Sequence, residues 1–249
     1  MSDNLPMEST IEPIVTGDYL LPPNHRNAGK RAMSVAYLVR HPEATLLFDT
    51  GFPFDVEFSG NEGDMAIPTY PRSLTDALAA RGVSLEQIDL AANCHLHIDH
   101  AGGNHHLPPT VPIYVQRAEL ERARTVDAPQ EPIVRDALLL DERNYRPLDG
   151  EEELLPGIRV LPTPGHTDGH QSLLVATDAG PVFLGGQTVP GASDFTLVVY
   201  AWYLEQAGNI PVPPYPGWLP RVMELAPERA MFAHDLAIWE RDPGAALRR

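Results

Sequence analysis

The sequence predicts an α/β fold in a single domain of residues 1–249, in which short strands hold functional loops at one edge of a sheet. Three observations predict this fold. The length of 249 residues allows one large core. The 26 prolines and 19 glycines divide the chain into short segments, which favours short strands and loops over long helices. Short apolar runs repeatedly end in polar side chains of the kind that bind metals.

The first predicted elements are a hairpin and a helix. Residues 34–40 and 45–49 predict two strands, because both are rich in β-branched and apolar residues and a Pro-containing turn separates them. Ser73 is typical of a helix N-cap, and the helix it begins is expected to run to Arg81, with Gly82 at its end.

Later elements follow the same pattern. Residues 117–124 predict a helix, and residues 189–220, rich in Pro, Gly and aromatic residues, predict a lid or insertion. The remaining apolar runs predict strands over residues 90–94, 113–115, 158–161, 172–176, 182–184 and 229–233.

Composition and charge exclude several function classes. The net charge of −16 and pI near 4.9 predict no binding to nucleic acid or to anionic membranes. Residues 151–153 are a short acidic run that predicts a solvated turn. The single cysteine forbids an internal disulfide, and no apolar run reaches the roughly 18–20 residues of a membrane span. Because residues 1–6 also lack the features of a secretory signal, we expect a cytoplasmic protein.

Four metal-ligand candidates lie within six residues. In His95-Leu96-His97 the two imidazoles project to the same side of an extended chain, because side chains alternate with a period of two. Asp99 and His100 can face a second, adjacent position once the chain turns at the glycines that follow. Imidazole nitrogens with a carboxylate suit Zn²⁺, with Fe or Mn as alternatives.

Two further histidines predict ligands from distant parts of the chain. His166 follows a Pro-Gly turn that can direct its ring inward, and His234 follows a predicted strand. His170 is expected to hydrogen-bond a neighbouring group rather than bind metal. Cys94 is interpreted as a small buried residue. The histidines predicted not to be ligands are His25, His41, His105 and His106.

These motifs, taken in order along the chain, resemble those of the metallo-β-lactamase superfamily. Within it the sequence is most similar to the N-acyl homoserine lactone lactonases, the quorum-quenching group. The resemblance covers most of the chain, from about Asp49 to Glu240. The segments that carry it are residues 93–97, 99–104, 115–120, 163–174 and 234–240, with the Gly185-Gly186 pair between them.

The resemblance implies a fold, a ligand set and a partner. The fold would be an αβ/βα four-layer sandwich of two mixed sheets flanked by helices, with the metals at one edge. His95, His97 and His166 would hold a first metal, and Asp99, His100 and His234 a second. The resemblance also suggests a homodimer.

The sequence departs from the family at two positions. Where the family usually places a metal-bridging aspartate, this chain has Gln187, which supplies a neutral carbonyl oxygen. Where the lactonases usually carry a tyrosine, it has Pro190. We therefore expect Gln187 to leave the second site weakened, with one ion bound or two held loosely. Tyr200 and Tyr203, from the predicted lid, either replace the missing tyrosine or simply pack.

The predicted activity is metal-dependent hydrolysis of a lactone or related acyl ester, N-acyl homoserine lactones among them. A hydroxide generated at the metal would attack the carbonyl carbon. Asp99 would orient that nucleophile and pass a proton to the leaving alkoxide, or serve only as a ligand. The side chains expected to contact an acyl chain, or to pack in the core, are Phe52, Phe54, Trp202, Tyr203, Tyr215 and Trp218.

Two alternative functions follow from the departures. One is another activity on the same scaffold, such as thioester cleavage, β-lactam hydrolysis or a non-hydrolytic biosynthetic step. The other is a catalytically silent ligand-binding protein, which Gln187 and Pro190 would favour. Metal content and a substrate panel separate these functions.

Overall fold

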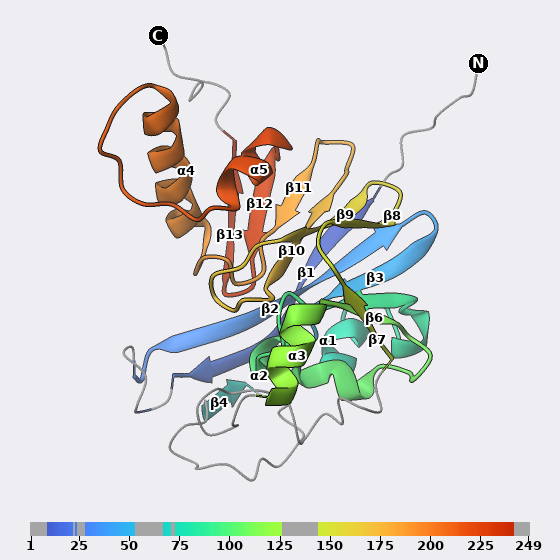
Figure 1. Cartoon of the computed structure of the whole chain (residues 1–249). Coiled ribbons are helices and arrows are strands. Elements are labelled where there is room, and N and C mark those ends of the chain that lie inside the picture. Colours follow the sequence, from blue (N-terminus) through green and yellow to red (C-terminus); the bar gives the residue numbers. More distant parts are fainter. Residues whose placement is uncertain are drawn as a thin grey trace, which may run out of the picture.

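Two mixed β-sheets lie face to face, with helices on their outer sides (Figure 1). The computed structural model describes residues 9–21, 23, 28–52, 67–70, 73–125 and 144–241. Phe54 and His25, named above, lie outside these residues. The N-terminal part of the chain builds one sheet and the C-terminal part the other.

The first sheet has the strand order β4-β1-β2-β3-β5-β6-β7. Strands β1, β2 and β3 are antiparallel, whereas β3, β5, β6 and β7 run parallel to one another. The strands are β1 (Thr10–Leu20), β2 (Arg31–His41), β3 (Ala44–Phe48), β4 (Ile67–Tyr70), β5 (Leu90–Ala92), β6 (Ile113–Gln116) and β7 (Tyr145–Leu148).

The second sheet has the order β13-β12-β11-β10-β9-β8, in which only the β11–β12 pair is parallel. Its strands are β8 (Glu152–Leu155), β9 (Ile158–Pro162), β10 (Gln171–Val175), β11 (Val182–Leu184), β12 (Arg229–Phe232) and β13 (Asp235–Glu240). The helices are α1 (Leu74–Ala79), η2 (Leu85–Gln87), α2 (Ile98–Ala101), η3 (Gly102–His106), α3 (Arg117–Thr125), α4 (Ala192–Gln206) and α5 (Leu219–Glu224).

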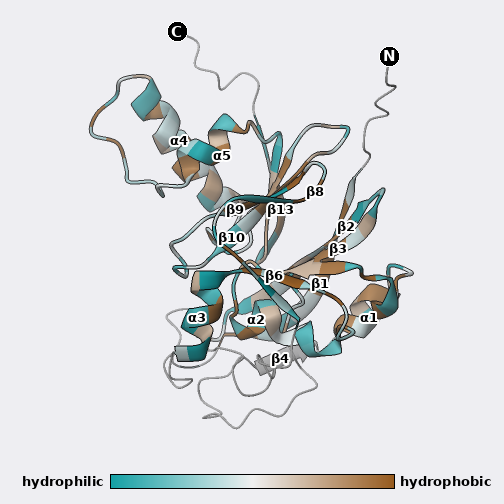
Figure 2. Cartoon of the chain, turned by 45° about the vertical axis from the view of Figure 1, so that its right-hand side comes forward, coloured by the Kyte–Doolittle hydropathy of each residue, from teal (hydrophilic) through white to brown (hydrophobic). Residues whose placement is uncertain are grey.

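Alternation along the strands produces the four layers. On β2, Tyr37 and Val39 face the second sheet and pack with residues such as Val160, whereas Leu38 faces the side of α1. On β11, Phe183 faces outward into the cluster that α4 and α5 cover. Figure 2 shows α3 as mainly hydrophilic, consistent with a helix exposed on the outer layer. The predicted αβ/βα sandwich is therefore confirmed.

Most predicted elements are present. The hairpin of β2 and β3 is confirmed, with its turn at Pro42 and Glu43. So is the cap of α1, where the Ser73 hydroxyl accepts a hydrogen bond from the Asp76 amide at 3.1 Å. The prediction of a turn at residues 151–153 is wrong: Glu152 begins β8, an edge strand on which acidic side chains stay exposed.

The segment 189–220 is mostly not a loop. It contains α4, whose Phe195 and Val199 are buried against the second sheet. Its action as a lid stays a prediction. Among the described residues, no helix is both long and apolar enough to cross a bilayer.

Candidate metal centre

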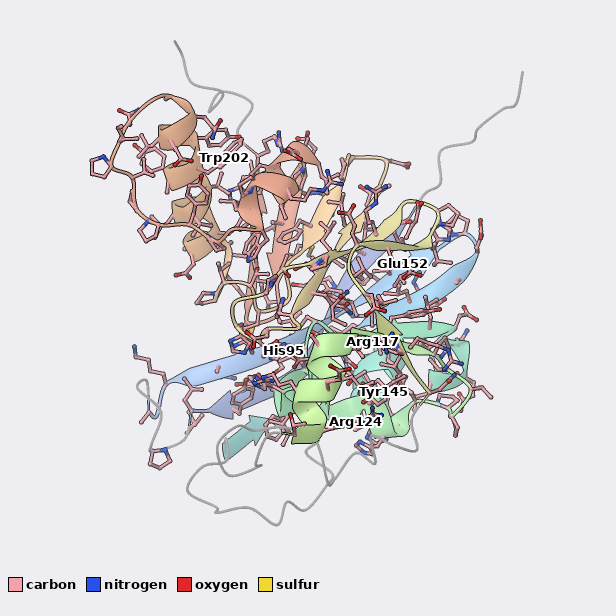
Figure 3. The ribbon with its side chains drawn as sticks, viewed as in Figure 1. His95, Arg117, Arg124, Tyr145, Glu152 and Trp202 are labelled. Carbon is pink, nitrogen blue, oxygen red and sulfur yellow. The ribbon has the colours of Figure 1, made fainter. Side chains whose placement is uncertain are left out.

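The candidate ligands lie on four loops, each of which follows a strand of the core. The loop after β5 leads into α2, the loop between β9 and β10 carries the Pro-Gly turn, and the other two follow β11 and β12. Figure 3 shows His95 between the two sheets. The ligand candidates on these segments are His95 and His97, with Asp99 and His100 on α2, then His166, then Gln187, then His234.

The first group brings together His95, His97 and His166. Their ligand nitrogens lie within 4.8 Å of one another, and the His97 Nδ1 is 3.0 Å from the His166 Nε2. Burial lowers the pKa of His97 to about 3 and that of His166 to about 4, and holds the pKa of His95 far below its usual value. All three rings are therefore neutral near pH 7 and offer lone pairs.

The second group brings together Asp99, His100 and His234. The Asp99 Oδ2 is 3.5 Å from the Nε2 atoms of both histidines, which are 3.3 Å apart. Burial alone would raise the pKa of Asp99, but His100 and His234 outweigh it and hold that pKa well below its usual range. Asp99 therefore supplies a negative charge at this position.

Asp49 and a backbone carbonyl orient the rings of the second group. The His100 Nδ1 lies 3.0 Å from the Asp49 Oδ2, and the His234 Nδ1 lies 2.6 Å from the Met33 carbonyl oxygen. Asp49 adopts φ 64°, a strained conformation for a non-glycine residue, and is 2% exposed. Both Nδ1 atoms therefore donate outward, and the Nε2 atoms point toward Asp99.

Cys94 is buried as predicted, but it is not an inert packing residue. Its Sγ donates to Asp49 Oδ2 at 3.0 Å and lies 3.0 Å from the His95 Nδ1. The His95 Nε2, on the other side of the ring, is buried and has no hydrogen-bond partner among the described residues. Burial, together with Asp49, raises the pKa of the thiol, so it stays protonated and is a poor metal ligand.

Gln187 occupies the position where the family resemblance implies a bridging aspartate. Its Oε1 lies 3.0 Å from the His100 Nε2, and its backbone N–H donates to the His170 Nε2 at 3.1 Å. The His170 Nδ1 is 2.9 Å from the Thr163 hydroxyl. His170 thus holds a neighbouring loop, which confirms its predicted hydrogen-bonding role.

Glu119 on α3 supports the loop between His95 and His97 from below. It is fully buried, and its Oε1 accepts a hydrogen bond from the Leu96 amide at 3.0 Å. Gly169 lies so close to it that an added Cβ would sit 2.2 Å from the Glu119 backbone nitrogen. Helix α3 and the loop that carries His166 therefore pack in direct contact.

Tyr19 on β1 also reaches the second group. Its hydroxyl donates to the Asp99 Oδ2 at 3.0 Å, and its ring lies 5.6 Å from that of Phe52. Burial and the Asp99 charge raise the pKa of the phenol well above its usual value. The aromatic pair of Tyr19 and Phe52 thus borders the centre.

The two tyrosines predicted on the lid lie elsewhere. Tyr200 is 59% exposed on α4, and Tyr203 packs against Trp202, with ring centroids 4.9 Å apart. Figure 3 places Trp202 in the α4 region, well separated from His95. The structure therefore brings Phe52 to Tyr19, which contacts Asp99, whereas Tyr203 packs on Trp202.

Sequence reasoning missed Asp49 and Tyr19 as functional residues. Asp49 had one usable signal, the Asp-Thr-Gly sequence that ends a predicted strand. Tyr19 had none, because β1 was not predicted. Both act across more than forty residues of sequence, at separations of 45 positions to Cys94 and 80 to Asp99.

The donor set fits a divalent cation. The first group offers neutral imidazoles, one of which has a buried nitrogen without a partner in the described chain, and the second adds a carboxylate. Nitrogen and oxygen donors of this kind suit borderline divalent metals.

Comparisons with known proteins agree with this geometry. Residues 29–234 match the family model of the metallo-beta-lactamase superfamily. The chain is 39% identical over 158 residues to an N-acyl homoserine lactonase of Bacillus sp, a match that covers 59% of this chain and 60% of the relative. It is 28% identical over 153 residues to the N-acyl homoserine lactonase AttM of Rhizobium johnstonii. The chain thus spans about 60% of the length of the curated relatives it matches.

Solved structures match over more of the chain. One is the AiiA protein of B. thuringiensis, a mutant with N-decanoyl-L-homoserine bound at its active site, at 25% identity and a TM-score of 0.68. It covers 93% of this chain and 95% of that one. Another, an N-acyl homoserine lactone hydrolase with the product N-hexanoyl-L-homoserine at its catalytic metal centre, has a TM-score of 0.67. The fold, the order of the ligand motifs and the family match place this chain in the metallo-β-lactamase superfamily.

Proposed function

We propose that this protein is a zinc-dependent hydrolase that opens the ring of lactones, with N-acyl homoserine lactones as its substrate class. One observation carries the proposal: two ligand groups adjoin each other, with the rings of His95 and His100 only 4.2 Å apart. Relatives at 35–39% identity are N-acyl homoserine lactonases, which supports this substrate class.

The superfamily fold implies a divalent metal, and the residues present fit one. The ligands would be His95, His97 and His166 in the first position, and Asp99, His100 and His234 in the second, with Gln187 beside it. A bound metal would lower the pKa of water and polarise the substrate carbonyl.

The chain's own residues would then orient the reactants and move one proton. Water adds to the lactone carbonyl carbon, the ring C–O bond breaks, and the leaving alkoxide takes up a proton. Asp99 is anionic, and its Oδ2 lies 3.5 Å from the Nε2 atoms of both histidines of the second group, so it is placed to accept the proton that the attacking water loses and to pass it to the alkoxide.

The apolar border of the centre supports an acyl substrate. Phe52 is 6% exposed, and its ring packs on Tyr19, whose hydroxyl reaches Asp99. An acyl chain would bury apolar surface here, beside the ligands, rather than at Tyr200 on the exposed face of α4.

The catalytically silent alternative has one observation in its favour. In the described residues, the position next to His100 that could carry a second charge holds the neutral Gln187 amide, 3.0 Å from the ring. A protein of this kind would bind a ligand without turnover.

The test is a substrate panel on protein loaded with zinc. Acid release is measured to monitor ring opening of N-acyl homoserine lactones with several acyl-chain lengths. Simple lactones, thioesters and a β-lactam are tested in the same assay. We expect turnover of the acyl homoserine lactones, with loss of at least about a hundredfold in His166→Ala. Turnover of thioesters alone would overturn the substrate class.

Two further measurements complete this test. No bound metal, and no turnover with zinc, manganese, iron or cobalt, would support the silent protein. The predicted homodimer is checked by light scattering on the same sample.

A further inference from the structure

The Tyr19 hydroxyl contacts the same Asp99 oxygen that faces the two histidines of the second group. The phenol donates to the Asp99 Oδ2 at 3.0 Å, and this same oxygen lies 3.5 Å from the Nε2 atoms of His100 and His234. The atom that Tyr19 holds is therefore the one that Asp99 offers to a cation. A carboxylate oxygen has two lone pairs, so it can accept a hydrogen bond and bind a metal together.

The sheet fixes the Tyr19 hydroxyl in place. Tyr19 pairs with Ala32 across β1 and β2, and its side chain is 4% exposed. The Ser34 Oγ, on β2, lies 3.4 Å from the phenol oxygen and can donate to it, which leaves the phenol proton for Asp99. The ring of Phe52 restrains the other side. Little side-chain entropy remains to be lost when the hydrogen bond forms.

Gln187 makes this contact more important in this chain. Its amide brings no negative charge to the second group, so Asp99 supplies the carboxylate there. A free aspartate side chain can rotate its oxygens away from the two histidines. The hydrogen bond from Tyr19 opposes that rotation.

We propose that Tyr19 is a positioning residue of the second metal position, which holds the Asp99 carboxylate toward His100 and His234 and sets how tightly that position binds a cation. The inference rests on the metal-binding part of the proposed function and is independent of the substrate. It predicts an effect confined to the second position, because Tyr19 contacts Asp99, which belongs to the second group, and the first group consists of three histidines.

The experiment compares Tyr19→Phe with a matched control, Tyr37→Phe. Tyr37 is also a buried tyrosine, but its hydroxyl donates to the Phe232 carbonyl at 2.8 Å and not to a ligand candidate. Each variant loses one buried hydroxyl and keeps its ring. Zinc and cobalt(II) are titrated into metal-free protein against a chelator, and the visible spectrum of bound cobalt(II) follows each position.

We expect Tyr19→Phe to weaken binding of the second equivalent about tenfold or more, and to change the cobalt(II) band that appears with it. The first equivalent should change less than about twofold, and Tyr37→Phe should change neither.

Three results would overturn the role of Tyr19. They are an unchanged or tighter second equivalent in Tyr19→Phe, equal weakening of both equivalents, or the same effect in Tyr37→Phe. Wild-type protein that binds one equivalent would refute the second position itself, and protein that binds none would refute the proposed function as well.

Discussion

In the metal-free protein, the His100 ring is expected to be protonated on both nitrogens. A cation in the second position must displace the proton on Nε2. Its Nδ1 lies 3.0 Å from the Asp49 Oδ2 and its Nε2 3.0 Å from the Gln187 Oε1, so a doubly protonated ring donates to both. Burial alone would lower the pKa of His100, but Asp99 and Asp49 outweigh it and raise that pKa to about 9.

The size and sign of the effect follow from this pKa. Below about pH 9 the proton competes with the metal, so the affinity for the second equivalent should rise about tenfold per pH unit up to about pH 9. At about pH 7 the penalty is about 2 × 1.36, or roughly 2.7 kcal/mol, which is about a hundredfold in affinity. His97 and His166, with pKa values of about 3 and about 4, are already neutral, so the first equivalent should show no such slope.

The assay is a chelator-buffered zinc titration between about pH 7 and about pH 9, with proton release measured in weak buffer. Asp49→Asn removes one of the charges that raise the pKa of His100, so its slope should move to lower pH. Equal affinity for the second equivalent at both ends of this range would refute the reasoning. A slope that survives unchanged in Asp49→Asn would assign the proton to another group.

Three other predictions test the centre and its support. Gln187→Glu, which keeps the side-chain length, should tighten binding of the second equivalent at least about tenfold, and Gln187→Asp should tighten it less. Chelator competition measures both affinities. Unchanged affinity would refute a place for this side chain at the second position. His166→Ala should abolish tight binding of the first equivalent, and retained binding in the same titration would remove it from the ligand set. Gly169→Ala should lower the free energy of unfolding by about 1–3 kcal/mol, because the added Cβ meets the Glu119 backbone. Gly217→Ala, with open space around it, should change that free energy by less than about 0.5 kcal/mol. Equal effects of the two variants in urea denaturation would contradict this.

The sequence predicted the part of the site that is local. Four candidate ligands fall within six residues that follow a buried strand, so their spacing alone indicated two adjacent positions. The four are His95, His97, Asp99 and His100. His166 and His234 could be assigned because each follows a short apolar strand and the family resemblance supplied their order. Their convergence itself depends on the pairing of β9–β10 and β11–β12, which no local pattern shows.

The parts that could not be predicted depend on contacts between distant strands. Strand β1 was missed because Pro13 and Gly17 interrupt its pattern. The structure accommodates both residues. Pro13 lies opposite Tyr37 of β2. On the other side of β1, the described residues of β4 pair only with Asp18–Leu20, and the register with β2 shifts between Val15 and Gly17. Without β1, nothing indicated that Tyr19 reaches Asp99.

Helix α4 shows a different limit of the sequence. Its aromatic residues are spread around the helix, so composition alone favoured a lid with tyrosines near the substrate. In the structure Phe195 is fully buried against the second sheet, which turns Tyr200 to solvent. The side of the helix that packs on β12 and β13 decides the direction of each tyrosine, and that side is set by the tertiary fold.

The departure at Gln187 changes the charge of the side chain, while other contacts hold the backbone of its loop. The His170 Nε2 accepts a hydrogen bond from the Gln187 backbone N–H, and the His170 Nδ1 lies 2.9 Å from the Thr163 hydroxyl. Neither contact uses the side chain of residue 187, so both are compatible with an amide or an acid there. With a neutral oxygen there, Asp99 supplies the carboxylate charge of the second group, and the charges of Asp99 and Asp49 keep His100 protonated up to about pH 9. Because the proton on His100 and a cation at the second position both require the same nitrogen, we expect the second position to be sensitive to pH, and a carboxylate at residue 187 to raise the pKa of His100 further. The first position, built from neutral rings, stays available throughout.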